Sequence, residues 1–276
     1  SSAASDVYKR QDTFPVRQLR WAQVSPDGSK VVYSALGHLY IKDLQAQGDA
    51  AEPRRLTRQN EEFEFFPSFS RDGKRLVYVG WNDEKLGHIR ILDLRSGKQT
   101  QVTRSGGKYL WPRLSPDGQR VVYVKSRGGQ LIAPWNGLDT GVYLADIDGK
   151  SEPVRLSKEG EAPQFGARND EVFVTRTTQP SEVEVRRSLW RIHTRDRQET
   201  EVARGEFVGE FSVSPDGRWL GFVERFHAYV TPLPLTGKPL NVGPRMDGLP
   251  VRKLSLNAGQ SLHFSSDSSQ VHFSSG

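Results

Sequence analysis

Histidine side chains are the first candidates for chemistry, because imidazole transfers protons near neutral pH and is a common metal ligand. No two of them stand as His-x-His or as His-x-x-x-His. His263 and His272 flank a predicted turn, so they would face each other across a hairpin with space for a metal. Two strand histidines without a metal is the interpretation that we favour. The six histidines are His38, His88, His193, His227, His263 and His272.

Recurring aspartates are the second candidates, because carboxylate oxygens are the ligands that calcium prefers. Each stands directly before a glycine, in the phrase Ser-Pro-Asp-Gly or Ser-Arg-Asp-Gly. An Asp in that place accepts hydrogen bonds from nearby backbone, and Gly adopts the positive φ that the turn requires. We therefore interpret these residues as structural. The turn residues are Asp27, Gly28, Asp72, Gly73, Asp117, Gly118, Asp216 and Gly217.

No nucleophile stands in a recognisable setting. The sequence has no Gly-x-Ser-x-Gly phrase, and it has no cysteine, which excludes thiol catalysis and Cys-ligated zinc. Gly149-Lys150-Ser151 matches the end of a phosphate-binding loop, but Leu144 stands where that loop begins with Gly. We predict no catalytic, cofactor-binding or metal-binding residue and no cofactor in this chain.

Two insertions are the candidate binding loops. Residues Arg127–Gly141 interrupt the third repeat unit, and Pro232–Pro250 interrupt the fifth. Loops on a rigid scaffold often carry binding residues, and Trp is a frequent anchor. An insertion without a function stays open as an alternative, because loops tolerate added residues at little cost. The candidate partner-binding loop consists of Trp135, Asn136 and Asp139.

An internal repeat determines the elements that position these residues. An anchor phrase recurs at steps of 45, 45, 51, 48 and 51 residues. Each unit continues with a β-branched run such as Val121–Val124, a third run such as Val142–Ile147, and an ending such as Val102-Thr103. Four short alternating strands per unit are typical of a propeller blade. The anchors are Ser25, Ser70, Ser115, Gly166, Ser214 and Ser265.

The predicted fold class is all-β, a six-bladed β-propeller of four-stranded antiparallel blades. The last blade would be incomplete, with two strands and an unpaired edge. Residues 1–12 share no pattern with the repeats and resemble a translated adapter scar, so we treat them as a non-native or disordered leader to a domain at 13–276. The predicted blades lie near 13–58, 59–104, 105–158, 159–204, 205–256 and 257–276.

The charge distribution bears on the class of partner. The net charge is +6, from 39 Lys and Arg against 33 Asp and Glu, and the basic residues are spread along the whole chain. Without a basic block or stacking aromatics beside the arginines, we expect no nucleic-acid partner. No apolar run approaches the roughly 20 residues of a membrane-spanning helix, so no membrane span is predicted.

The Ser-Pro-Asp-Gly hairpin, its aliphatic strand and the Leu-Thr ending together resemble the TolB-like, or WD-like, propeller repeat. This resemblance extends from Thr13 to the end of the sequence and implies a propeller. It does not imply one function. Such propellers occur in the TolB translocation protein, in prolyl-oligopeptidase-type and tricorn-type proteases, and in front of amidohydrolase domains.

Several longer phrases are similar to the propeller of large bacterial amidohydrolases. They are Phe14–Ala22, Phe63–Ser70, Ser214–Phe226 and Asn257–Ser265. This resemblance implies a non-catalytic propeller that gates or scaffolds a missing catalytic domain, which would bind a divalent, zinc-like metal. It also implies a periplasmic or secreted location, with the missing domain or another protein as partner. Two alternatives stay open: a free-standing TolB-like interaction propeller of the cell envelope, and the propeller of a prolyl-oligopeptidase-type serine peptidase.

Overall fold

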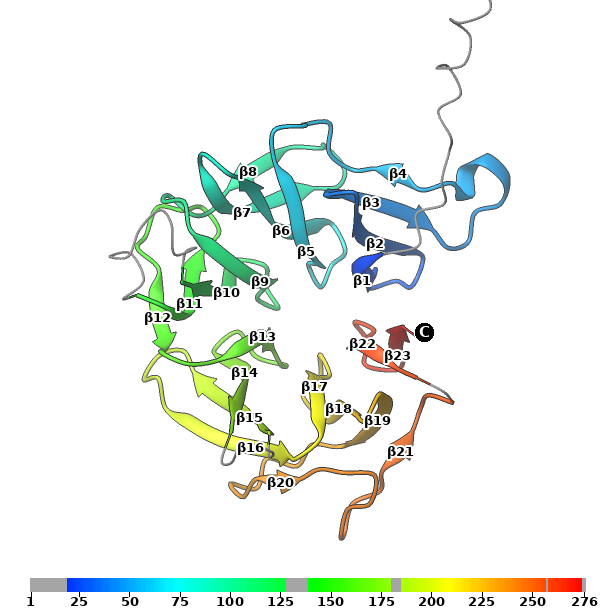
Figure 1. Ribbon diagram of the computed structural model, residues 1–276, viewed down its shortest axis with the longest axis vertical. Helices are drawn as coiled ribbons and strands as arrows, with labels where there is room; N and C mark the ends of the chain where they lie inside the picture. Colours follow the sequence, from blue (N-terminus) through cyan, green and yellow to red (C-terminus); the bar gives the residue numbers. More distant parts are fainter. Residues whose placement is uncertain (1–18, 128–138, 180–184, 257, 275–276) are drawn as a thin grey trace, which may run out of the picture.

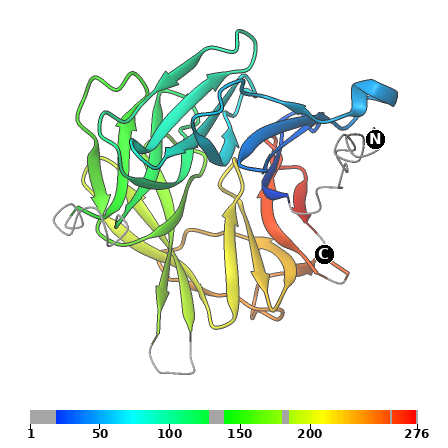
Figure 2. The same ribbon diagram turned by 45° about the horizontal axis from the view of Figure 1, so that its top comes forward.

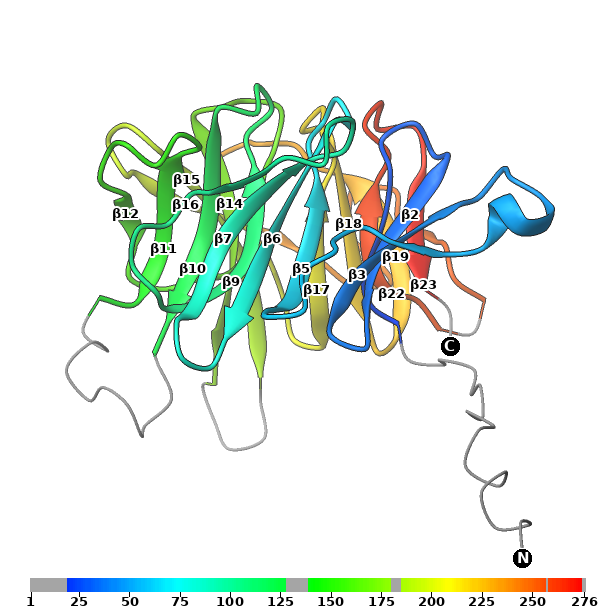
Figure 3. The same cartoon turned by 90° about the horizontal axis from the view of Figure 1, so that it is seen from above.

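A computed structural model describes residues 19–127, 139–179, 185–256 and 258–274, which form six β-sheets around a central channel (Figure 1). In every sheet the first strand lies beside the channel, and the later strands lie farther out. Figure 3 shows the ring edge-on, with the strands running between its two faces. The chain therefore folds as an all-β propeller. The innermost strands are β1, β5, β9, β13, β17 and β22.

The first three blades each contain four antiparallel strands. Blade one consists of β1 (Arg20–Val24), β2 (Lys30–Ala35), β3 (His38–Asp43) and β4 (Arg54–Arg55), with a short 3-10 helix, η1 (Gly48–Ala51), before β4. Blade two consists of β5 (Phe63–Phe69), β6 (Arg75–Asn82), β7 (Leu86–Asp93) and β8 (Gln99–Gln101). Blade three consists of β9 (Lys108–Leu114), β10 (Arg120–Ser126), β11 (Gly141–Asp146) and β12 (Val154–Ser157).

The remaining sheets are less regular. Blade four consists of β13 (Glu161–Phe165), β14 (Glu171–Thr178), β15 (Arg186–His193) and β16 (Glu199–Gly205), joined at its outer edge by β20 (Leu240–Asn241). Blade five consists of β17 (Val208–Val213), β18 (Trp219–Glu224), β19 (His227–Pro232) and β21 (Arg252–Lys253). The sixth sheet is a hairpin of β22 (Gln260–Phe264) and β23 (Val271–Ser274).

The predicted count of six blades is therefore wrong for the described chain, which has five blades and one hairpin. The sixth anchor, Ser265, marks the turn between β22 and β23, and this two-stranded hairpin stands where the sequence predicted an incomplete last blade of two strands. The hairpin fills the place between blades five and one (Figure 2), where β22 contacts β17 on one side and β1 on the other.

The hydrophobic core is divided into clusters that lie between consecutive sheets. One cluster joins Val32 and Leu39 of blade one to Leu76 and Tyr78 of blade two, all at most 1% exposed. Four similar clusters join each following sheet to the next, as far as the hairpin. Burying each such aliphatic side chain contributes about 1.5–3 kcal/mol. The alternation that predicted the strands therefore also supplies the contacts between blades.

The anchor turns share one hydrogen-bond pattern. In the first, the Ser25 hydroxyl donates to Asp27 Oδ1 at 2.6 Å and accepts from the Lys30 backbone N–H at 2.9 Å. The Asp27 carboxylate also accepts from the Ser29 N–H, and these bonds lower its pKa to about 2. The equivalent Ser–Asp bonds occur at Asp72, Asp117, Asp216 and Asp267. We call the face that carries these turns the turn face, and the opposite face, where strands two and three connect, the hairpin face.

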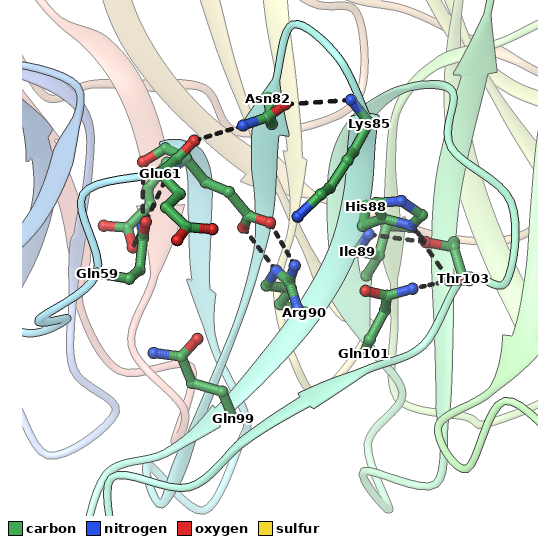
Figure 4. A network of polar contacts seen from close by, with 12 residues as sticks. Gln59, Glu61, Asn82, Lys85, His88, Ile89, Arg90, Gln99, Gln101 and Thr103 are labelled. Atoms are coloured by element: carbon green, nitrogen blue, oxygen red, sulfur yellow. Dashed lines mark hydrogen bonds and ion pairs between the residues drawn. The ribbon is translucent and has the colours of Figure 1, made fainter.

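In blades two and five, a Thr or Ser after the outermost strand holds the third strand. Thr103 accepts the Ile89 backbone N–H at 3.0 Å, within the polar network of blade two shown in Figure 4. Ser255 accepts the Ala228 N–H in the same way. The residues just before these two N–H donors are His88 and His227, and each imidazole lies 3.3–3.4 Å from the matching hydroxyl. We therefore interpret His88 and His227 as half-buried histidines on strands.

Blade one uses a carboxylate where blade two uses a hydroxyl. Glu64, which is fully buried, accepts the Leu39 N–H at 2.8 Å and the Thr57 hydroxyl at 2.7 Å. Its other oxygen accepts from the Gln59 amide at 2.7 Å. Because Glu64 belongs to β5, this group of bonds fastens blade two to blade one.

The second insertion is not only a loop. Its strand β20 pairs in parallel with β16 of blade four, although the flanking strands β19 and β21 belong to blade five. Val242 follows β20, is 8% exposed, and donates its N–H to the Arg204 carbonyl at 2.8 Å. The insertion thus connects two blades along their outer edges.

Replacing Val242 with Ala should lower the free energy of unfolding by about 2 kcal/mol, because it leaves a cavity under this connection. Urea denaturation measures the change. Leu235→Ala, in the same insertion but 42% exposed, serves as the control and should stay within about 0.5 kcal/mol of the wild type. Equal losses in the two variants would contradict a structural role for β20.

Within the described ranges, no helix has the length and apolarity to cross a membrane.

Candidate functional site: the central channel

A bulge in the innermost strands aims side chains into the channel. In β1 the pairing with β2 shifts between Arg20 and Gln23, and the other innermost strands show the same irregularity. Such bulges bend a strand and redirect its side chains. Five residues at the bulges have φ between 45° and 54°, a left-handed conformation that costs a non-glycine residue about 1–2 kcal/mol. They are Trp21, Phe66, Trp111, Ala162 and Ser261.

These residues define a first ring around the channel, four positions before each anchor. In blade five the same position holds Glu210. Trp21, Phe66 and Trp111 come from three consecutive blades and contact one another, with ring centroids 4.4 Å and 5.8 Å apart. We call these three residues the aromatic arc. Strand direction places the arc toward the hairpin face. Half of the channel wall at this level is therefore aromatic, and the other half is small or acidic.

A second ring, two positions before each anchor, lies closer to the turn face. All of its members are polar, and both rings line a cavity of about 510 Å³. The second ring consists of Gln23, Ser68, Arg113, Gln164, Ser212 and His263.

Three polar side chains of the two rings, those of Gln164, Glu210 and His263, fasten neighbouring sheets together. Gln164 of blade four donates to the Phe211 carbonyl at 3.1 Å and accepts the Val213 N–H at 2.8 Å, both in blade five. Glu210 of blade five accepts the N–H groups of Ser261 and Leu262 in the hairpin, at 3.0 and 2.9 Å. These side chains position backbone, and each of their oxygen atoms already accepts a backbone N–H.

His263 closes the ring between the hairpin and blade one. Its Nε2 accepts the Val24 N–H at 3.1 Å, so Nδ1 carries the proton and donates to the Ser261 carbonyl at 3.2 Å. Burial lowers the pKa of His263 to about 4. The imidazole is therefore neutral at pH 7, and both of its nitrogens are engaged.

The predicted approach of His263 and His272 occurs, since their residues pair across the hairpin and their ring centroids lie 5.3 Å apart. His263 has no free lone pair for a metal, however. In the part of the chain that the structure describes, no group of three or more His, Asp or Glu side chains is placed to hold a metal ion.

Arg71 crosses the channel at its turn-face end. It occupies the anchor position where three other repeats have Pro. Its guanidinium donates to the Pro215 carbonyl of blade five at 3.0 Å and to the Gly166 carbonyl in the turn between β13 and β14 of blade four. Burial lowers the pKa of Arg71. This side chain narrows the turn-face end, so the aromatic arc is reached from the hairpin face.

The candidate partner-binding loop lies apart from these rings. Trp135 and Asn136 fall outside the described residues. Asp139 is described: its carbonyl accepts from the Tyr143 hydroxyl at 2.8 Å, and its carboxylate lies 3.9 Å from Arg155.

The two channel rings were not predicted from the sequence. Aligning the residues two and four positions before each anchor would have revealed them, because the repeat places equivalent positions at the same height.

Comparison with known proteins agrees with this fold. No family model matches the chain. The Tol-Pal system protein TolB of Francisella tularensis is 27% identical over 138 residues, which is 50% of this chain and only 28% of that protein. The chain thus matches well under a third of that relative's length.

Two solved structures show the same architecture. An oligogalacturonate lyase from Vibrio parahaemolyticus has a TM-score of 0.62 at 12% identity, covering 92% of this chain and 73% of its own. TolB from Acinetobacter baumannii has a TM-score of 0.54 at 19% identity, covering 78% of this chain and 51% of its own. The sequence relative and the solved structures together identify the fold as a TolB-like β-propeller.

Proposed function

We propose that this chain is a non-catalytic, TolB-like interaction propeller of the cell envelope, which receives a segment of a partner protein through the hairpin-face mouth of its channel. The observation that carries the proposal is that the titratable side chains of the channel are bonded to backbone, whereas its aromatic side chains are available for contact. Glu210 and His263, the groups suited to proton transfer, have their hydrogen-bonding atoms engaged by backbone. The aromatic arc is the part of the wall that offers contact area.

The surface around the mouth supports the same function. Phe63 and Phe207 lie at the starts of innermost strands, and Leu36 and Phe226 lie in the turns between strands two and three, all on the hairpin face. These four side chains are 50–67% exposed. Exposed apolar side chains gathered on one face are typical of protein interaction sites. The likeness to TolB, whose name assigns it to the Tol-Pal system, supports an envelope location and a protein partner.

Purified Pal of Francisella tularensis is the partner to test first. Binding should be measurable by calorimetry, and Trp111→Ala should weaken it roughly tenfold or more, because truncating a central Trp anchor removes about 2 kcal/mol or more. Trp219→Ala, at a 39% exposed position on the turn-face end of β18, is the matched control. Circular dichroism verifies that both variants fold. Binding that is absent, or equally strong in Trp111→Ala, would contradict the channel as the partner's site.

A second candidate is the propeller of a larger amidohydrolase-type hydrolase, in which another domain would hold a divalent metal. The phrase around Phe63–Ser70 favours it, and in the structure this segment forms the wall that carries Phe66. Sequencing the source DNA beyond the codon for Gly276 separates the two candidates. A frame that continues into a barrel with a His-x-His pair would favour the hydrolase.

A further inference from the structure

Arg113 is a cation in the channel without a matching anion. It lies in the second ring on β9, and its one hydrogen bond among the described residues goes from Nη1 to the Pro112 carbonyl at 3.1 Å. A guanidinium has five N–H donors in a planar fork that matches a carboxylate. Burial lowers the pKa of Arg113 to about 10, so the group remains charged at neutral pH while its hydration is reduced.

The other charged groups of the channel do not satisfy it. Glu210 is the nearest carboxylate that influences Arg113, but both of its oxygens accept backbone N–H groups of the hairpin. Arg71 and Arg187 differ from Arg113, because each donates to carbonyl oxygens of other blades or strands. Within the described channel wall, Arg113 is thus the arginine with several donors still available.

The surroundings of Arg113 define what else a ligand must offer. Trp111 lies two residues earlier on the same strand and belongs to the aromatic arc. In an extended peptide ligand, two residues span roughly 6–7 Å. A ligand that places a carboxylate on Arg113 can therefore place an apolar or aromatic group, two residues farther along its own chain, on the aromatic arc.

A peptide matches this pattern better than an acidic saccharide does. An oligosaccharide of uronic acids carries a carboxylate on every unit, and each carboxylate needs its own cation. Arg71 and Arg187 donate to backbone carbonyls, so Arg113 is the one arginine of the described wall with several donors available, and it lies beside an apolar surface. One acidic side chain with one apolar neighbour suits that wall.

We infer that the segment entering the channel is an extended peptide that pairs an aspartate or glutamate carboxylate with Arg113 and lays an aromatic or aliphatic side chain against Trp21, Phe66 and Trp111. This inference rests on the proposed function, since it names the chemistry of the partner segment. It makes Arg113 the residue that selects for acidic segments.

Calorimetric titration with two synthetic peptides tests the inference. Acetyl-Gly-Asp-Gly-Phe-amide should bind roughly tenfold or more tightly than acetyl-Gly-Asn-Gly-Phe-amide, because a carboxylate forms charge-assisted hydrogen bonds with the guanidinium that a neutral amide does not. Arg113→Gln should abolish the preference for Asp, and Arg113→Lys should retain part of it. Arg195→Gln, at an exposed position in the turn between β15 and β16, is the matched control and should retain all of it.

Equal binding of the two peptides to the wild type would overturn the inference, and this comparison holds even if Arg113→Gln fails to fold. A preference for Asp that survives in a folded Arg113→Gln variant would also overturn it. Digalacturonate that binds in an Arg113-dependent manner, while the Asp peptide does not, would assign the site to acidic saccharides instead. If Pal binding depends on Trp111 but the peptides are not distinguished, the proposed function stands and the carboxylate inference alone falls.

Discussion

Glu64→Ala should lower the free energy of unfolding by about 3–5 kcal/mol, the largest stability effect that we expect from a single substitution in this chain. The variant leaves the Leu39 N–H, the Thr57 hydroxyl and the Gln59 amide without their acceptor. Because Glu64 is fully buried, water cannot readily replace the lost oxygens. Urea denaturation followed by circular dichroism measures the loss.

Two further variants isolate the cause. Glu64→Gln keeps the shape and one acceptor oxygen but turns an NH₂ group toward a donor, so it should give an intermediate loss. Thr57→Val should cost less in the Glu64→Ala background than alone, since the two side chains share one hydrogen bond. Glu52→Ala, at an exposed position, is the control and should change stability by less than about 0.5 kcal/mol. If the losses of unfolding free energy from the substitutions at positions 57 and 64 were additive, this hydrogen bond would not be the link between the blades.

The second large effect is a loss of stability as the pH falls below 7, centred on His263. Burial holds the folded-state pKa of this imidazole near 4, against an ordinary value of 6.5. The unfolded chain therefore takes up a proton between pH 6.5 and 4 that the folded chain excludes. The contribution of His263 is fully present above pH 6.5 and declines as the pH falls, by up to about 3 kcal/mol on reaching pH 4.

Unfolding free energies at pH 7, 6 and 5 measure this decline, and the His263→Gln variant tests its origin. The variant lacks the titrating group, so its stability should fall less steeply with decreasing pH, by a difference approaching 1.4 kcal/mol per pH unit. His272 faces His263, and burial lowers its pKa as well, so His272→Gln should flatten the dependence further. Identical slopes of unfolding free energy against pH for the wild type and His263→Gln would show that His263, at the contact between the hairpin and blade one, does not cause the pH dependence.

Among the described residues, apolar clusters join the other neighbouring sheets, but none joins the hairpin to blade one. The contact that His263 makes between the hairpin and blade one is therefore important for closing the ring. The five core clusters join blade one to blade two and so on to the hairpin, whereas the hairpin meets blade one through polar contacts such as that of His263 with Val24. Ser266 adds a second contact at the turn face, donating to the Pro26 carbonyl at 3.1 Å. The closure is thus the part of the ring where pH acts most directly.

The sequence by itself determined the strands and the propeller architecture, because these follow from local rules. A β-branched apolar run such as Val121–Val124 and the Ser–Asp–Gly chemistry of a turn act within a few residues, so a single repeat unit already contains the information. Regular steps between anchors then imply that equivalent units stand side by side.

The tertiary structure decided what no local rule contains. The sequence predicted six blades with the last one incomplete, and the structure has five blades and a two-stranded hairpin in the sixth place. It also placed β20 on blade four, stretched Arg71 across the channel, and left Arg113 without an anion. These contacts join residues far apart in the chain, Arg71 to Pro215 for example, and ring closure alone brings such residues within hydrogen-bonding distance.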